Sequence, residues 1–442
     1  MSPQVSIGLI GMGSVGSGVL RILDTHARDI AERLGAEVVV RRVAVRDLAR
    51  PRAQQLPAGV LTDQVEALLE DPEIQLVVEL MGGVSPAREL VLRALRAGKP
   101  VITANKALLA EHGEELFAAA TEAGVDIYYE GAVAGGIPII RTLREGLASD
   151  RVHALVGIVN GTTNFILSEM AGSGRGFEEV LADAQARGFA EADPSADVDG
   201  HDAAQKLCLL AALCFGVRVS PAEVHTEGIR AVELDDVAWA AEFDLRLKLL
   251  AIGRRHEDGA VELRVHPTFI PRQSLLANVS GPFNAVLVKS EALGPALFYG
   301  QGAGGMPTGS AVVSDIIEAA RGLLSGVSGR IPHRAVHDHF VKDLHQRPFE
   351  EVVCPAYLRF TVEDKPGVLG RIATALGEQG VSIRSLVQKE AHEHGGPGVP
   401  VVVLTHAASQ RAIDAALATI DGFPELRQPT RRVRVEALEE HG

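Results

Sequence analysis

The sequence predicts an α/β protein that opens with a doubly wound parallel sheet and continues into two units that mix helices and strands. Helix and strand patterns alternate at short intervals up to about residue 130, which is typical of a parallel sheet. Beyond residue 131 come glycine-rich turns and longer strands, and the last segment has the order βαββαβ. We therefore expect three units in 442 residues, a length that allows several hydrophobic cores.

The first unit begins with a strand over residues 4–10, and the turn GMGSVG leads into a helix over residues 15–23. A second strand ends near Arg46, and the runs DPEIQLVVEL and RELVLRALRAGKPVITAN add further strands and a helix. A helix over residues 310–324 has the apolar spacing of an element that covers a sheet. We assign residues 1–130, together with about 308–328, to this unit.

Residues 131–307 form the second predicted unit, which is mixed α+β. Long strands are expected in HALVGIVN and ELRVHPTFI, and a long helix starts near Gly200 and ends at Gly216. A polar linker over residues 329–354 leads to the third unit, residues 355–438. Its order is that of a ferredoxin-like split βαβ fold, and the loop AHEHGGPG between its middle strands is expected to be mobile.

Charge and hydropathy narrow the possible partners. The formal net charge of −14 and the absence of a basic patch argue against a nucleic-acid partner. The sequence starts directly with a strand pattern, without the features of a signal peptide, and no apolar run approaches about 18 residues. We expect a cytoplasmic protein that acts on a small molecule and not on a membrane.

The glycine motif at the start of the chain predicts dinucleotide binding. Gly11, Gly13 and Gly16 form GxGxxG between a strand and a helix, which is the context that this motif requires. Glycines there allow a tight turn and let a pyrophosphate approach the backbone N–H groups of the helix start. The loop as a whole also includes Met12, Ser14 and Val15. A purely structural turn is the alternative.

The residues after the second strand bear on the choice of dinucleotide. A 2′-phosphate needs a cation, whereas a ribose 2′-hydroxyl prefers a carboxylate. Arg46, Arg50 and Arg52 favour NADP, although Arg50 and Arg52 could each be simply a solvated surface residue. Asp47 could accept a ribose hydroxyl, so NAD stays possible.

Two later strand ends are expected on the same side of the sheet, where ligands bind in such folds. Gly82 would let the backbone approach a nicotinamide, and Lys106 would bring an ammonium group to the cleft. Lys106 could equally be a surface residue.

The stretch EADPSADVDGHDAAQK, residues 191–206, is rich in carboxylates and leads into an apolar helix. Asp197 or Asp199 is expected to cap that helix. Asp202 and Lys206 are four residues apart and therefore share a helical face. They could be an exposed ion pair of about 0.3–0.5 kcal/mol, or Lys206 could be a partly buried acid–base group beside the apolar stripe.

The run AQARGFAEADPSADVDGHDAAQK closely resembles the signature of homoserine dehydrogenases. The similarity extends to GLIGMGSVG, VELMGG, TANKALLA, EGAVAGGIPII, GIVNGTTNFIL and QGAGGMPTGSAV. The third unit, with VEDKPGVLGRIATALGEQGVSI, resembles an ACT domain, an amino-acid-sensing module, and its turn matches at Asp364, Pro366 and Gly367. The resemblance implies a Rossmann-type NAD(P)-binding domain, a substrate-binding and dimerisation domain, and a regulatory ACT domain.

The resemblance also implies an activity: reversible NAD(P)H-dependent reduction of L-aspartate 4-semialdehyde to L-homoserine, with threonine as feedback inhibitor and a homodimer or homotetramer as the assembly. Lys206 would donate the proton, Asp202 would orient substrate and lysine, and Lys106 would contact cofactor and substrate. The other implied contacts are Glu191 and Gly188 for the substrate, Gly302 for the cofactor, and Glu130 with the carbonyls of Val133, Gly135 and Ile137 for a monovalent cation such as Na⁺. A non-catalytic sensor and a dehydrogenase for another amino-acid aldehyde are the alternatives.

Overall fold

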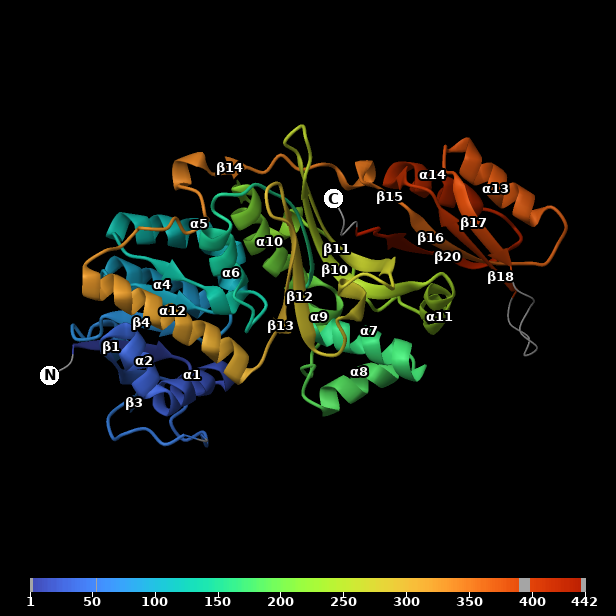
Figure 1. Cartoon of the computed structure of the whole chain (residues 1–442). Helices are drawn as coiled ribbons and strands as arrows, with labels where there is room; N and C mark the ends of the chain where they lie inside the picture. The colour runs from blue at the N-terminus through green and yellow to red at the C-terminus, as the bar shows by residue number, and fades with distance from the viewer. Residues whose placement is uncertain (1–2, 53, 389–397, 439–442) are drawn as a thin grey trace.

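The computed structural model describes residues 3–52, 54–388 and 398–438. Most of the loop AHEHGGPG, predicted to be mobile, lies outside these described residues. Figure 1 shows three units side by side, with the N-terminal unit at one end, the C-terminal unit at the other and the second unit between them. Among the described residues, no helix is both long and apolar enough to cross a membrane.

The first unit contains a sheet with the strand order β3-β2-β1-β4-β5-β6, in which all neighbouring strands are parallel. Its strands are β1 (Gln4–Ile10), β2 (Glu37–Ala44), β3 (Leu61–Thr62), β4 (Leu76–Glu79), β5 (Val101–Thr103) and β6 (Ile127–Tyr128). The helices between them are α1 (Ser14–Thr25), α2 (Ala27–Leu34), α3 (Glu66–Leu69), α4 (Ser85–Arg96) and α5 (Lys106–Ala123). This order is doubly wound, so the predicted fold class is confirmed.

Helix α12 (Gly305–Ser325) returns from the second unit and packs across α1, as Figure 1 shows. The two helices approach so closely that glycines are required where they meet. A Cβ atom on Gly18 would lie 2.0 Å from the carbonyl oxygen of Gly305, and one on Gly309 would lie 3.0 Å from the carbonyl carbon of Gly18. Val312 and Ile316 of α12 share a buried core with β1. Helix α12 therefore lies against the first unit, although it follows the second unit in the sequence.

The second unit contains an antiparallel sheet with the order β13-β12-β7-β10-β11. Its strands are β7 (Val152–Ile158), β10 (Leu245–Arg255), β11 (Val261–Pro271), β12 (Phe283–Ser290) and β13 (Gly294–Gln301). The helices are α6 (Ile139–Arg141), α7 (Gly161–Ser173), α8 (Phe177–Ala186), α9 (Ser195–Val198), α10 (His201–Phe215) and α11 (Leu234–Glu242). Helix α10 is almost entirely buried and packs against β10 and β11 on one side and α5 on the other. It therefore joins the second unit to the first.

The third unit has the strand order β20-β16-β18-β17, the order of a ferredoxin-like fold. Its elements are β16 (Ala356–Val362), α13 (Val368–Glu378), β17 (Ile383–Gln388), β18 (Val399–Thr405), α14 (Gln410–Ile420) and β20 (Leu426–Val435). Strand β20 also pairs in parallel with the end of β11, so the sheets of the second and third units are continuous. Local patterning did not predict this junction.

The segment predicted as a polar linker is ordered along the second unit. Its short strand β14 (Lys342–Asp343) pairs with β8 (Val217–Arg218), which follows α10. The backbone N–H of Val261 donates to the carbonyl of His345 at 2.8 Å. Near its end, the ring of Phe349 stacks on His225. These contacts hold the linker against the second unit up to the start of the third unit.

Candidate functional site

Asp202 and Lys206 form a buried ion pair on the first two turns of α10. The Lys206 Nζ donates to Asp202 Oδ2 at 2.8 Å and to the carbonyl oxygen of Val159 at 2.7 Å. Asp202 is 7% exposed and Lys206 is 9% exposed. The interpretation of this pair as an exposed surface ion pair is therefore wrong, and the partly buried lysine is observed.

Lys106 reaches the same carboxylate from the first unit. It is the first residue of α5, directly after β5, so it lies at the carboxyl edge of the parallel sheet. Its Nζ lies 3.1 Å from Asp202 Oδ1, and about a third of its side chain is exposed. One carboxylate thus contacts an ammonium group from each of two units.

Asn160, which sequence reasoning missed, completes this lysine–aspartate cluster of Lys106, Asn160, Asp202 and Lys206. Its Nδ2 donates to Asp202 Oδ2 at 2.8 Å and to Asp197 Oδ1 at 2.6 Å. Its Oδ1 caps α7 by accepting from the backbone N–H of Thr163 at 2.8 Å. Asn160 ends the predicted strand HALVGIVN directly before Gly-Thr-Thr, and an asparagine that can cap a following helix was the available signal.

The electrostatics keep Asp202 ionised. Burial alone would raise its pKa, but Lys206 and Lys106 outweigh burial and hold the pKa below its usual value. The neighbouring Asp197 has a raised pKa, first because it is buried and second because Asp202 is negative. The cluster therefore concentrates negative charge on one carboxylate between two ammonium groups.

The predicted carboxylate caps of α10 are wrong. Gly200 is the N-cap residue, with φ +86°, and no side chain caps the helix. Asp197 instead accepts from Asn160, and Asp199 pairs with Arg230 at 2.6 Å. A glycine in the left-handed conformation turns the chain sharply, so both carboxylates point to other partners.

Glu191 and Gly188 lie on the loop that joins α8 to α9. The carboxylate of Glu191 is exposed, and its backbone carbonyl accepts from the Gln185 side chain at 3.0 Å. Gly188 has φ +75° and leaves open space where a side chain would be. Neither residue is joined to the lysine–aspartate cluster by a hydrogen bond or ion pair within the described ranges.

The glycine turn between β1 and α1 leaves backbone groups open at the helix start. Gly11 has φ +100°, and a Cβ atom there would lie 2.7 Å from the carbonyl oxygen of Leu80. A Cβ atom on Gly16 would lie 2.3 Å from the carbonyl oxygen of Gly11. Gly13 and Ser14 are exposed, and no side chain caps α1. Free N–H groups at such a helix end attract phosphate.

Exposed arginines follow β2 at the same edge of the sheet. Arg46 and Arg50 are exposed, and no acidic side chain among the described residues pairs with either of them. Arg52 differs, because its guanidinium donates to the carbonyls of Asp47, Leu48 and Arg50. The Asp47 carboxylate accepts from the N–H of Ala49 at 2.8 Å. Two guanidinium groups are thus available to a ligand there.

Gly82 and Gly302 lie at two further junctions near this edge. Gly82 follows β4 with φ +71° and open space beside it. Gly302 follows β13 and is pressed against Gly135, since a Cβ atom on Gly135 would lie 2.5 Å from the Gly302 carbonyl oxygen. The turn after β13 thus approaches the loop after β6 backbone to backbone, and the N–H of Gly136 donates to the carbonyl of Gln301 at 3.0 Å.

That loop, residues 130–137, has the donor groups of a cation site. The Glu130 carboxylate is buried and accepts from the N–H groups of Ile140 and Arg141 at 2.8 Å. Val133 and Gly135 are buried, and no backbone N–H of the described residues donates to their carbonyl oxygens. The carbonyl of Ile137 accepts from the backbone N–H of Ile139 at 2.8 Å. Oxygens of this kind suit a hard cation.

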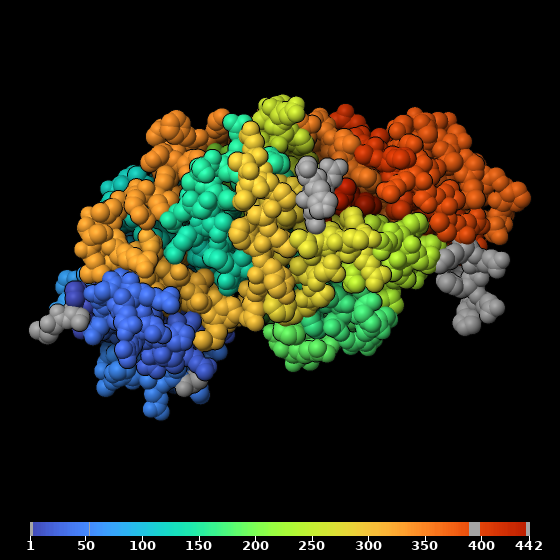
Figure 2. Space-filling view, in the orientation of Figure 1, coloured from blue at the N-terminus to red at the C-terminus, as the bar shows by residue number. Residues whose placement is uncertain are grey.

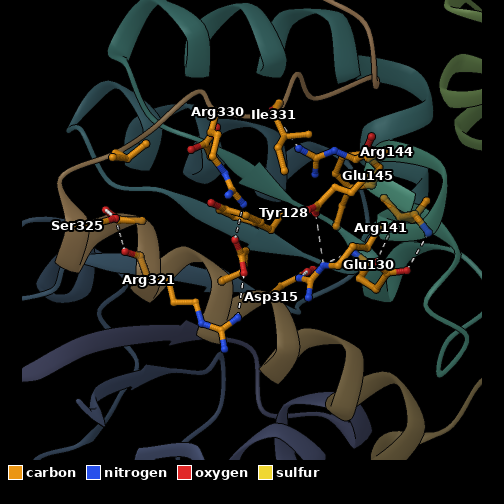
Figure 3. Close-up of a pocket in the computed structure, with 16 residues that line it drawn as sticks. Tyr128, Glu130, Arg141, Arg144, Glu145, Asp315, Arg321, Ser325, Arg330 and Ile331 are labelled. Carbon is orange, nitrogen blue, oxygen red and sulfur yellow. Dashed lines mark hydrogen bonds and ion pairs between the residues drawn. The ribbon is translucent and has the colours of Figure 1, made fainter. Parts of the chain in front are cut away.

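The two buried carboxyl groups beside this loop also favour a bound cation, which would offset their negative charge. Burial raises the pKa of Glu130, and burial together with Glu130 raises that of Asp315 to about 7. Both residues line a cavity of about 280 Å³, and Figure 3 shows Glu130, Arg141 and Asp315 gathered in it. The cavity includes no member of the lysine–aspartate cluster, so we do not place the substrate there.

Dinucleotides bind at the carboxyl edge of a doubly wound sheet, and here that edge carries an open glycine turn and Lys106, which contacts the buried Lys206–Asp202 pair. A group of that kind can exchange a proton while a hydride moves. The fold and the cluster therefore define an NAD(P)-dependent oxidoreductase.

Comparisons with known proteins identify the particular family. Family models match residues 11–130 (homoserine dehydrogenase, NAD binding domain), 138–317 (homoserine dehydrogenase) and 356–422 (ACT domain). A homoserine dehydrogenase of Pseudomonas aeruginosa is 45% identical over 98% of this chain and 99% of its own length. The chain belongs to the homoserine dehydrogenase family.

Solved structures agree with this family. The crystal structure of a homoserine dehydrogenase from Thiobacillus denitrificans has a TM-score of 0.93 and 45% identity, over 99% of this chain and 100% of that one. A hyperthermophilic archaeal homoserine dehydrogenase in complex with NADPH has a TM-score of 0.59 and 27% identity, over 72% of this chain and 97% of that one.

Proposed function

We propose that the protein catalyses the reversible NAD(P)H-dependent reduction of L-aspartate 4-semialdehyde to L-homoserine, a step towards threonine, methionine and isoleucine. The observation that carries the proposal is the buried Lys206–Asp202 pair, which Lys106 contacts from the carboxyl edge of the parallel sheet. Membership of the homoserine dehydrogenase family supports the same reaction.

In this proposal Lys206 supplies the proton. A bound dinucleotide would supply the hydride for the aldehyde carbon, and the carbonyl oxygen would take up one proton to become the hydroxyl. An ammonium group has three N–H donors, and two of those on Lys206 are held by Asp202 and by the Val159 carbonyl. The third is free to face the substrate oxygen. Asp202 orients Lys206 and Lys106, and Asn160 orients Asp202.

Glu191 and Gly188 are proposed to hold the substrate's α-ammonium group. The support is that the Glu191 carboxylate is exposed on the loop that leads into α9 and α10. The left-handed backbone at Gly188, which lacks a side chain, leaves space for a small ligand. An ammonium group would pair with the free carboxylate.

NADP is the proposed dinucleotide, and NAD remains a possible substitute. The available guanidinium groups of Arg46 and Arg50 support a 2′-phosphate contact, as does the archaeal relative in complex with NADPH. Met12, Gly13, Ser14 and Val15 would hold the pyrophosphate with Gly11 and Gly16. Gly82, Gly302 and Lys106 would lie at the nicotinamide end.

A monovalent cation, with Na⁺ as the candidate, is proposed at Glu130 and the carbonyls of Val133, Gly135 and Ile137. It would neutralise the buried carboxylate charge and tie the loop after β6 to the Gly302 turn. The support is the set of available oxygens and the raised pKa of Glu130.

The ACT unit is proposed to bind threonine as an inhibitor. Its turn at Asp364, Pro366 and Gly367 supports an effector site, and Gly367 opens α13 with φ +91°. An effector that binds one state more tightly than another shifts activity. We also propose the domain limits given above and a homodimer or homotetramer; the cytoplasmic location stays a prediction.

The test is the rate of homoserine oxidation by the purified chain with NADP and with NAD. Each cofactor is assayed with and without threonine, and with NaCl or choline chloride. We expect faster turnover with NADP, inhibition by threonine and activation by Na⁺. No oxidation with either cofactor would contradict the reaction, whereas missing salt or threonine effects would remove only those two proposals.

A further inference from the structure

The third unit reaches the second unit through a fully buried arginine. Arg434 of β20 is 1% exposed, and its Nη1 and Nη2 each donate to the Glu227 carboxylate at 2.8 Å. Its Nε donates to Gln410 at 2.8 Å, and its guanidinium lies over the Phe349 ring. Three N–H groups and one face of this guanidinium therefore have defined partners, which makes the bidentate contact rigid.

The edge of β11 explains why these residues meet. The short strand β9 (His225–Thr226) pairs with Arg264 and Val265 of β11, while β20 pairs with Thr268 and Phe269 further along the same edge. Glu227 directly follows β9, and its N–H donates to the carbonyl of Val265 at 2.8 Å. Arg434 and Glu227 thus lie close to each other along the same edge of β11.

The segment after β9 packs on the start of the helix that carries the lysine–aspartate cluster. The N–H of Ile229 donates to the carbonyl of Val198 at 2.7 Å. A Cβ atom on Gly228 would lie 2.3 Å from that carbonyl oxygen, and one on Gly200 would lie 3.4 Å from the Glu227 carbonyl oxygen. Backbone therefore touches backbone at the turn into α10, two residues before Asp202.

A cavity of about 620 Å³ lies beside this contact between the two units. Asp199, Glu227 and Arg230 form part of its wall from the second unit, and Asp421 and Arg431 form part of its wall from the third. These charged groups and the cavity lie beside an apolar part of the junction, where the Tyr357 ring of the third unit packs edge-on against Phe269 of the second. Arg434–Glu227 is one of the contacts through which a shift of β20 can reach the start of α10, beside the pairing of β20 with β11.

We propose that Arg434 is a positioning residue for the reaction: by holding Glu227, it fixes the turn at Val198–Gly200 and with it the placement of Asp202 and Lys206. The proposal rests on the proposed roles of Asp202 and Lys206. It gives the third unit a physical connection to the chemistry of the second, through which a change in β20 alters turnover.

The test is a double-mutant cycle of Arg434→Lys and Glu227→Gln, with kcat for homoserine oxidation as the readout. Lysine keeps the charge of Arg434 but cannot make the bidentate contact. We expect each variant to lower kcat about tenfold, since small misplacements of reacting groups are costly. The double variant should lose no more than either single variant, because both changes break one contact. The dissociation constant for NADP, measured by calorimetry, should stay near the wild-type value.

Arg432→Lys is the matched control, because Arg432 lies two residues away on β20 and pairs with Asp414 inside the third unit. It should leave kcat unchanged. Wild-type kcat in both Arg434→Lys and Glu227→Gln, or independent losses that multiply in the double variant, would overturn the proposal. If Arg434→Lys fails to fold, Glu227→Gln decides alone, since its side chain is partly exposed. A wild-type chain that does not oxidise homoserine would instead contradict the proposed function.

Discussion

The glycine turn and the lysine–aspartate cluster, the two ends of the proposed site, consist of different kinds of residues. The proposed dinucleotide end contains glycines, whose missing side chains let Gly11, Gly16 and Gly18 contact other backbone directly. At the proposed chemical end, charged side chains converge on Asp202 from α5 and α10. The first end is therefore sensitive to added volume, and the second to lost charge. Substitutions should separate binding from turnover accordingly.

The largest expected effect is on turnover at the charged end. Asp202→Asn removes the carboxylate that orients two ammonium groups, so we expect kcat to fall about 1,000-fold, while the dissociation constant for NADP stays nearly unchanged. Steady-state kinetics and calorimetry check both values. Asp193→Asn is the control, since Asp193 is exposed in the same acidic stretch. Equal losses in turnover and NADP binding would contradict the division between the two ends.

The next largest effect is the loss of stability expected when a side chain is added to a glycine at the contact between α1 and α12. Gly18→Ala places a Cβ atom 2.0 Å from the Gly305 carbonyl oxygen, and we expect about 3 kcal/mol of destabilisation. Gly172→Ala is the same change in a helix with open space, and it should stabilise by about 0.5–1 kcal/mol. Thermal unfolding of both variants gives the comparison. If Gly18→Ala melts at or above the wild-type temperature, the close helix contact is wrong.

A smaller effect concerns the pH dependence of stability. The folded pKa of Asp202 lies below its unfolded value, so its contribution is complete above about pH 4 and is lost as pH falls through the lowered folded pKa. We expect wild type to exceed Asp202→Asn by about 2 kcal/mol at pH 7 and by less as pH falls below 4. Urea unfolding at several pH values measures the difference. A difference that is constant with pH would show that Asp202 is not held by its lysines.

The smallest effect tests the arginines after β2. The double variant Arg46→Ala, Arg50→Ala should raise KM for NADP about tenfold, because two charged contacts to a 2′-phosphate are lost, and should leave KM for NAD unchanged. Arg28→Ala is a surface control, since Arg28 is exposed and pairs with Glu32 within α2. An equal rise in both KM values would remove the proposed 2′-phosphate contact.

Local patterns were enough for much of the fold and for part of the site. Alternating helices and strands, the GxGxxG context and the i, i+4 spacing of Asp202 and Lys206 are all local features, and the structure contains each of them. Spacing alone left the nature of that pair open, because burial depends on packing against α5 and the sheet. The specific reaction came from resemblance to a family.

What the sequence did not predict depends on long-range contacts. The pairing of β20 with β11 joins residues far apart in the chain, and no local period encodes it. The expected carboxylate caps of α10 failed because Asn160 and Arg230, from distant segments, bind Asp197 and Asp199 more specifically than the helix end does. Asn160 itself was missed, since its partners are visible only in three dimensions.

The most direct test of the proposed chemistry is a pair of measurements on Lys206→Ala: the rate of homoserine oxidation and the dissociation constant for NADP. Lys206 is the proposed proton donor and has no part in the glycine turn. We expect oxidation to be lost and NADP to bind with nearly wild-type affinity. Wild-type oxidation by this variant would contradict the assignment of Lys206 and, with it, the role of the lysine–aspartate cluster.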